Sequence, residues 1–280
     1  MEIIHSISKM QSLCSSLRTE GLRIGFVPTM GGLHEGHLSL VDLIKERVDI
    51  LVLSIYVNPT QFGHNEDLDK YPRDLDQDKT LCIDRNVDYI FAPSTEEMYQ
   101  SNYSTKISEN SLSIGLCGSS RPDHFSGVAL VCAKLFNICQ PSVVAFGQKD
   151  AQQVAVIKRM VRDLNFQIDV LVGPIIREYD GLAMSSRNRY LSVENRDKAL
   201  SLNRSLQRGK QLFTEGTTDA RKITNEIKSD LSRVDGLELD YVEIVNQENL
   251  VAELDVKTKQ SICVVAAWVN KVRLIDNYCF

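Results

Sequence analysis

The chain has 280 residues, a formal net charge of -5, and a composition that is 43% hydrophobic and 25% charged. This length can bury one large or two modest cores, and the composition is that of a globular protein. The negative charge argues against a general nucleic-acid binder, which needs a basic surface. No apolar run approaches the roughly 20 residues that cross a bilayer, and residues 1–11 lack the basic-then-apolar layout of a secretion signal.

The N-terminal part of the chain alternates short apolar runs with helical patterns. Strands are predicted at residues 3–4, 24–27, 49–57, 87–92, 142–146 and 168–172, and helices at 8–19, from 38 onward, 71–85, 128–138 and 150–164. The run at 49–57 is almost continuously apolar, as in a strand buried on both faces of a parallel sheet. This alternation predicts βαβ units, and hence an α/β, Rossmann-like open parallel sheet with helices on both faces.

The pattern changes beyond a predicted boundary near Pro174. Two long polar helices are predicted at 194–215 and 219–234, followed by strands at 239–245, 261–269 and 272–275. We therefore predict a first domain over residues 1–174 and a smaller C-terminal α+β domain over residues 175–280.

The seven cysteines are odd in number, scattered along the chain, and never in C-x-x-C spacing. This pattern favours reduced thiols over a disulfide framework or a zinc site, and so predicts a cytoplasmic location. We expect most of the cysteines to be small core residues.

Residues 26–40, FVPTMGGLHEGHLSL, form the most informative stretch. An apolar strand, a Gly31-Gly32 turn and the start of a helix follow one another, which predicts backbone N–H groups and a helix dipole facing an anion. His34 and His37 are three residues apart and can reach one bound group. Histidine can contact phosphate as a neutral donor or as a cation. The alternative is a pair of solvated histidines in a glycine-rich turn.

Further polar clusters follow other predicted strands. Ligands of open parallel sheets bind beyond the carboxyl ends of the strands, so these clusters should meet at one edge. They are Asn58 and Gln61 after 49–57, residues 147–150 and Gln153 after 142–146, and Ile176 with residues 184–187 after 168–172. Each cluster alone also fits ordinary turn or capping chemistry. Their recurrence at one edge predicts a shared site.

The residue types in these clusters suit a triphosphate and a small acid. Lys149 and Arg187 supply permanent positive charge, and Ser185 and Ser186 add donors. The sequence has no Gly-x-Ser-x-Gly elbow and no Cys–His neighbour pair, so the attacking group is expected to belong to a substrate. A carboxylate that attacks the α-phosphate would give an acyl-adenylate, which an amine can open. The amides of Gln61 and Gln153 could orient such an acid without neutralising its carboxylate.

The His-x-Gly-His motif formed by residues 34–37 resembles the nucleotidylyltransferase superfamily. The fuller string PTMGGLHEGHLSL, with DLDKYPRD at 67–74 and LCGSSRPDHFSGV at 116–128, resembles the pantothenate synthetase (pantoate–β-alanine ligase) family over nearly the whole chain. The resemblance implies ATP-dependent condensation of (R)-pantoate with β-alanine to pantothenate through a pantoyl-adenylate, with release of AMP and diphosphate. It also implies Mg²⁺, a C-terminal domain closing over the ATP site, and a homodimer.

The resemblance also implies roles for individual residues. ATP would contact Met30, Gly31, Gly32, Leu33, His34, Glu35, Gly36, His37, Gly147, Gln148, Lys149, Asp150, Ile176, Met184, Ser185, Ser186 and Arg187. His34, His37, Lys149 and Arg187 form the expected catalytic set, with His37 as proton donor. Gln61, Gln153 and Asn58 would form the acid pocket, with Gln61 also near β-alanine. No residue is assigned as a metal ligand.

Three residues depart from the family pattern: Gly32 replaces Ala, Asp123 replaces Gly, and Ala151 replaces an aromatic residue. They affect turns and packing, while all the polar site residues remain, so we expect an active enzyme.

Two alternatives stay open at this point. An adenylyltransferase for phosphopantetheine or another small phosphate would need a second basic cluster, whereas the predicted acceptor pocket carries amides. A catalytically inactive relative would be expected to lack His37 or Lys149, and both are present. The polar, charged make-up of residues 65–71 favours a mobile segment, and closure of this segment over the site stays open.

Overall fold

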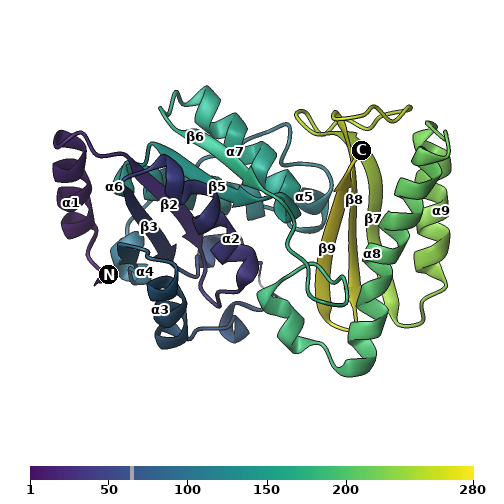
Figure 1. Cartoon of the computed structure of the whole chain (residues 1–280), viewed down its shortest axis with the longest axis horizontal. Helices are drawn as coiled ribbons and strands as arrows, with labels where there is room; N and C mark the ends of the chain where they lie inside the picture. The colour runs from purple at the N-terminus through teal and green to yellow at the C-terminus, as the bar shows by residue number, and fades with distance from the viewer. Residues whose placement is uncertain (64–65) are drawn as a thin grey trace.

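The computed structural model describes residues 1–63 and 66–280, which form two units lying side by side (Figure 1). Asn65, at the start of the segment for which the sequence favours movement, lies outside the described residues. The first unit is built on a six-stranded parallel sheet. Its strand order is β1 (Glu2–Ile4), β4 (Tyr89–Phe91), β3 (Ile50–Ile55), β2 (Ile24–Thr29), β5 (Val143–Gly147) and β6 (Asp169–Gly173).

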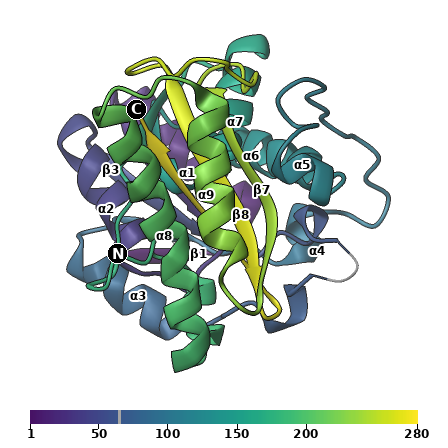
Figure 2. The ribbon, with the colours of Figure 1, turned by 90° about the vertical axis from the view of Figure 1, so that its right-hand side faces the viewer.

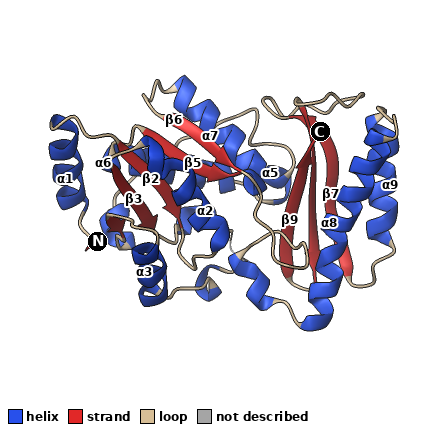
Figure 3. Cartoon of the chain, in the orientation of Figure 1, coloured by secondary structure: helices blue, strands red, loops and turns tan. Residues whose placement is uncertain are grey.

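Helices cover both faces of this sheet, as Figure 3 shows by colour. Helices α1 (Ile7–Thr19), α6 (His124–Cys139) and α7 (Ala151–Asp163) share one apolar core, while α2 (Glu35–Ile44) and α3 (Leu75–Asp84) share the other. Side chains alternate across a strand, so Phe26 of β2 enters the first core and its neighbour Val27 enters the second. The predicted α/β sheet with two covered faces is confirmed.

The second unit is a three-stranded antiparallel sheet, β7 (Leu237–Asn246), β8 (Ser261–Val269) and β9 (Val272–Cys279). Helices α8 (Val193–Thr214) and α9 (Ala220–Ser232) cover the face turned away from the first unit (Figure 2). Helix α9 buries Ile223, Ile227 and Leu231, spaced at four residues, against this sheet. Trp268, the single tryptophan of the chain, is on β8 and is 36% exposed.

Several boundaries differ from the predicted ones because of local hydrogen bonding. Helix α3 begins at Leu75 rather than at residue 71, since the side chain of Asp74 accepts the N–H of Gln77 as an N-cap. Helix α6 begins at His124, four residues earlier than predicted, and its first turn buries Phe125. The division at residue 174 stays a prediction; β6 ends at Gly173.

All seven cysteines lie in the described ranges, where they are free thiols, and six of them are buried. No helix in residues 1–63 or 66–280 combines the length and the apolar composition that a membrane span requires.

Candidate active site

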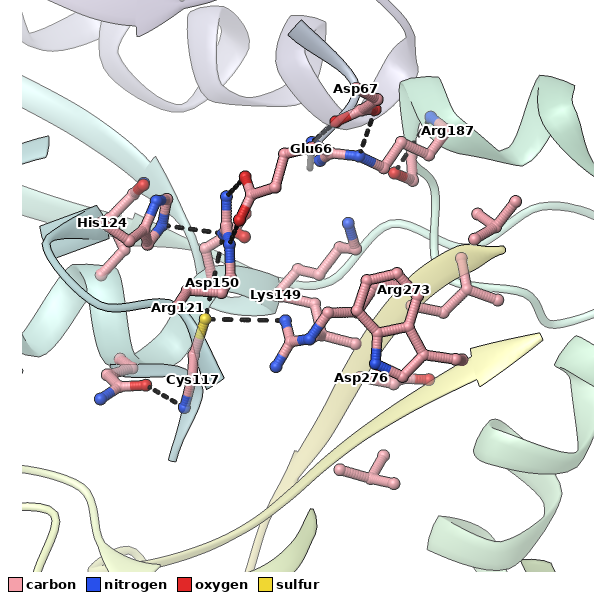
Figure 4. A pocket seen from close by; sticks show the side chains of 18 of the residues that line it. Glu66, Asp67, Cys117, Arg121, His124, Lys149, Asp150, Arg187, Arg273 and Asp276 are labelled. Atoms are coloured by element: carbon pink, nitrogen blue, oxygen red, sulfur yellow. Dashed lines mark hydrogen bonds and ion pairs between the residues drawn. The ribbon is translucent and has the colours of Figure 1, made fainter. Parts of the chain in front are cut away.

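A cavity of about 210 Å³, here called the inner cavity, lies where β2, β3, β5 and β6 end. The predicted residues in its wall are Met30, His34, Gly36, His37, Asn58, Gln61, Gly147, Lys149, Asp150, Gln153, Ile176, Met184, Ser185, Ser186 and Arg187. A second cavity of about 600 Å³, the outer cavity, lies between the two units and shares Lys149, Asp150, Gln153, Ser185 and Arg187 with the inner one (Figure 4). The expected gathering of clusters at one sheet edge is therefore observed.

Five residues that the sequence placed in the ATP site lie outside the inner wall: Gly31, Gly32, Leu33, Glu35 and Gln148. Leu33 is buried in the core beneath α2. Glu35 pairs at 2.7 Å with Arg85, which directly follows α3, and Gln148 donates to Asn277 at 3.4 Å.

The glycine turn before α2 is held from inside the protein. The N–H groups of Gly32 and Leu33 donate to the buried carboxylate of Asp78 at 2.9 and 2.7 Å, and the N–H of Gly31 donates to Thr29. Gly31 and Gly32 have φ of +80° and +61°, which explains the two glycines. The N–H groups of Gly32 and Leu33 are therefore taken by Asp78 and do not point to a bound anion, in contrast to the expectation for this turn. No local pattern connects Asp78 to a turn 46 residues away.

Replacing Asp78 by asparagine should destabilise the protein by about 2 kcal/mol, because an amide nitrogen would face one of the two N–H donors. The free energy of unfolding in urea measures the effect. Asp76→Asn, on the exposed side of the same helix, is the matched control and should change stability by less than about 0.5 kcal/mol. Equal stability of both variants would contradict the assigned role.

The two histidines are placed together by the start of α2. Nδ1 of His34 accepts the N–H of Gly36 at 3.1 Å, so the neutral ring carries its proton on Nε2. The two ring centres are 4.1 Å apart. Burial, with the charge of Lys149, lowers the pKa of His37 to about 4, and burial with neighbouring charges lowers that of His34 to about 3. Both rings are therefore neutral donors at pH 7 without a ligand.

Acid should destabilise the protein through its buried histidines. Burial and the charge of Arg121 also lower the pKa of His124 to about 4. An unfolded histidine binds a proton near pH 6.5, so the unfolded state binds more protons between pH 6.5 and about 4, and stability falls as the pH falls. Urea unfolding should show a loss of up to about 1.4 kcal/mol per pH unit for each ring. His124→Gln should make this dependence shallower; an unchanged slope would argue against a buried neutral ring.

The turn that carries Lys149 is held by the C-terminal sheet. The side-chain amide of Asn277 donates to the backbone oxygens of Gln148 and Lys149 at 2.9 and 3.0 Å. The neighbouring Asp276 is buried and accepts two hydrogen bonds from Arg177, at 2.6 and 3.0 Å. β9 thus fixes the position of the site lysine, a role that the residue pattern alone did not reveal.

The Ser-Ser-Arg segment forms the opposite wall. Ser186 is buried, and its hydroxyl lies 3.1 Å from that of Tyr71. The guanidinium of Arg187 donates twice to Asp67, at 2.9 Å in each case, and lies 5.6 Å from the ring centre of Tyr71. Sequence reasoning missed both partners, although they fall within the string DLDKYPRD.

Two of the residues predicted for the acid pocket, Asn58 and Gln61, lie on the turn after β3. Asn58 is buried, and its amide nitrogen donates to Gln61 at 3.1 Å and to the backbone oxygen of Gly127 at 3.2 Å. Its oxygen accepts from the hydroxyl groups of Thr60 and Tyr99. Because no amide donor of Asn58 is left over, the geometry favours a positioning role for Asn58 over the direct substrate contact predicted from the sequence. The side chain of Gln61 faces Met30 at 3.0 Å.

The fold and the site together define a Rossmann-like nucleotide-binding α/β protein. The sheet is parallel, and the cavity at its edge is lined by imidazole, ammonium, guanidinium and hydroxyl groups. A family model described as Pantoate-beta-alanine ligase matches residues 2–279, and the chain belongs to this family.

Relatives of known name agree with this assignment. The chain is 53% identical to a pantothenate synthetase of Thermotoga petrophila, over 99% of each chain. The crystal structure of pantothenate synthetase from Thermus thermophilus superposes with a TM-score of 0.94, at 40% identity over 99% of each chain. A pantoate-beta-alanine ligase of Francisella tularensis, complexed with beta-gamma ATP and beta-alanine, gives a TM-score of 0.81 at 34% identity, over 100% of this chain and 97% of that one.

Proposed function

We propose that the protein condenses (R)-pantoate with β-alanine to form pantothenate, using ATP and releasing AMP and diphosphate. The observation that carries the proposal is the inner cavity, where cationic and neutral donors adjoin the uncharged amides of Gln61 and Gln153. Two further findings support the proposal: the chain belongs to the Pantoate-beta-alanine ligase family, and the Francisella relative is named as complexed with beta-gamma ATP and beta-alanine.

In the first step, a carboxylate oxygen of pantoate attacks the α-phosphorus of ATP. A carboxyl O–P bond forms, the bond from the α-phosphorus to the bridging oxygen breaks, and diphosphate leaves with the bond electrons. We assign His34 and His37 to the phosphates as neutral N–H donors and Lys149 as a fixed charge that offsets charge building on the leaving group. Gln61 and Gln153 orient pantoate without neutralising its attacking carboxylate.

In the second step, the amine of β-alanine attacks the acyl carbon of pantoyl-adenylate. The C–N bond forms, the C–O bond to AMP breaks, and the proton lost by nitrogen passes to the departing phosphate or to water. We assign Ser185, Ser186 and Arg187 to the phosphate wall, where Arg187 has to exchange Asp67 for phosphate. The C-terminal unit, residues 175–280, closes over the nucleotide in this proposal.

Magnesium is proposed to enter with the nucleotide. Among the residues that the structure describes, no three His, Cys, Asp or Glu side chains form a metal cluster. Mg²⁺ bound to a triphosphate takes most of its oxygen ligands from phosphate and water, and Asp150 in the wall of both cavities can add a carboxylate. When bound, it neutralises charge on the phosphates. A homodimer is proposed from the family resemblance, and a cytoplasmic location from the free thiols.

The first experiment follows diphosphate and AMP from ATP, with pantoate alone and then with β-alanine. We expect a single burst of diphosphate with pantoate and steady turnover to AMP once β-alanine is added. Release that ignores pantoate but responds to a phosphorylated acceptor would indicate an adenylyltransferase instead. Nucleotide binding without release under any condition would indicate an inactive relative.

Replacing Gln153 by alanine should weaken pantoate binding by about tenfold, because a side-chain hydrogen bond to a charged ligand is worth about 1.5 kcal/mol or more. The pantoate dependence of ATP–diphosphate exchange measures the effect, with ATP affinity as the internal reference. Unchanged pantoate affinity would remove Gln153 from the acid pocket.

A further inference from the structure

The outer cavity has more positive groups than the phosphates of ATP require. Its wall includes Lys70, Arg121, Lys149, Arg187, Lys271 and Arg273. The following inference rests on the proposed function, in which the second substrate is an amino acid. Its amine reacts, but its carboxylate passes unchanged into the product, so a site that selects it needs a cation for that carboxylate.

Most of these cations are committed elsewhere or poorly placed. Lys149 and Arg187 are assigned to phosphate, and Lys70 and Lys271 are exposed. Arg273 belongs to the C-terminal sheet, where it pairs with Asp240 at 2.7 Å. Arg121 differs, because its guanidinium lies 3.4 Å from the backbone oxygen of Gln61, whose side chain lies in the acid pocket.

Arg121 already holds a carboxylate in the geometry that such recognition requires. Its Nε and Nη2 donate in parallel to the two oxygens of Glu66, at 2.7 and 2.5 Å (Figure 4). The side chains of Arg121 and Glu66 are only 17% and 21% exposed. Its remaining N–H groups point at His124, Cys117 and the oxygen of Gln61. A second carboxylate can therefore bind in the paired geometry only by replacing Glu66.

A short hydrogen-bond chain connects Arg121 to the acid pocket. Nδ1 of His124 lies 2.8 Å from the oxygen of Gln61, and Nε2 lies 3.0 Å from Nη1 of Arg121. Because an arginine can only donate, His124 has its proton on Nδ1 and accepts at Nε2. These hydrogen bonds fix the guanidinium of Arg121 relative to the turn that carries Gln61. The guanidinium therefore lies near the proposed position of the acyl group, and not near the far end of the nucleotide.

We propose that Arg121 binds the carboxylate of β-alanine and that Glu66 occupies the guanidinium until the amino acid displaces it. The next residue, Asp67, holds Arg187 in the same paired manner. Consecutive acids on one segment thus hold two arginines, one for the amino acid and one for phosphate.

The test compares β-alanine with β-alaninamide, which keeps the amine and lacks the negative charge. The wild-type enzyme should prefer β-alanine by about 100-fold in kcat/KM, the size expected for a paired, charge-assisted contact. Arg121→Gln should lower kcat/KM for β-alanine by about that factor and leave the amide unchanged, so that the preference disappears. Arg121→Lys should keep part of the preference. Arg273→Gln, the matched control in the same cavity, should keep the full preference.

Pantoate-dependent ATP–diphosphate exchange needs no amine and shows separately whether the first step is intact. Absence of this exchange in the wild-type enzyme would defeat the proposed function itself. If the Arg121→Gln enzyme keeps the exchange activity and still prefers β-alanine over its amide, only the role of Arg121 is overturned. If that variant has lost exchange, Glu66→Gln decides the matter. Removing the competing carboxylate should lower KM for β-alanine severalfold, and a higher KM would overturn the proposal.

Discussion

Replacing His37 by alanine should slow pantoyl-adenylate formation by about 10²- to 10³-fold, the usual cost of losing one oriented transition-state donor. The ring is presented by the first helical turn after β2, packs beside His34, and is neutral because burial holds its pKa near 4. In the proposed reaction it therefore acts as a neutral N–H donor rather than by a full charge. Single-turnover formation of diphosphate from ATP and pantoate measures the rate directly.

The matched control for this variant is His5→Ala, because His5 is exposed. Among the described residues, its ring forms a hydrogen bond only with the backbone oxygen of Ala92. That change should leave the single-turnover rate unaltered. Urea unfolding of the His37→Ala protein should show that the fold is retained. A near wild-type rate in a folded His37→Ala protein would exclude His37 from the chemistry.

Replacing Gly127 by alanine should both destabilise the protein and weaken pantoate binding. Helix α6 passes so close to the turn at 59–61 that an added Cβ would lie 2.3 Å from the backbone oxygen of Thr60 and 2.7 Å from the backbone nitrogen of Gln61. Backbone cannot yield as a side chain can, so the turn itself has to move. We expect a loss of about 2–3 kcal/mol, as in other overpacked sites, and a rise in the KM for pantoate of tenfold or more.

The control for this second variant is Gly115→Ala, whose added methyl group would meet no atom within 4 Å. Stability from urea unfolding and the KM for pantoate in the exchange reaction should be measured together on both proteins. Lower stability with an unchanged KM would mean that the turn relaxes without disturbing Gln61. Unchanged stability would contradict the close packing of α6 on the turn.

The features that the sequence predicted correctly are those encoded locally. A continuous apolar run predicts a strand such as β3. His34 and His37 lie within one helical turn of each other, beside a glycine pair, so their proximity also follows from the sequence. The features that it missed depend on partners far along the chain. Asp78 closes the turn at Gly32, and Asp67 holds Arg187 across 120 residues. The amide of Asn58 bonds to Gly127 and Tyr99 as well as to its near neighbours. A sequence shows which groups can donate or accept, but not which partners the tertiary fold assigns to them.

The position of Trp268 has a practical consequence. It is the only tryptophan in the chain, it lies opposite Arg273 in the pairing of β8 with β9, and it forms part of the wall of the outer cavity. Indole fluorescence responds to solvent access and to nearby charge, so the tryptophan emission of this protein comes from one known place between the two units. Arrival of nucleotide or amino acid there can be followed optically in the unlabelled protein, on the time scale of a single turnover.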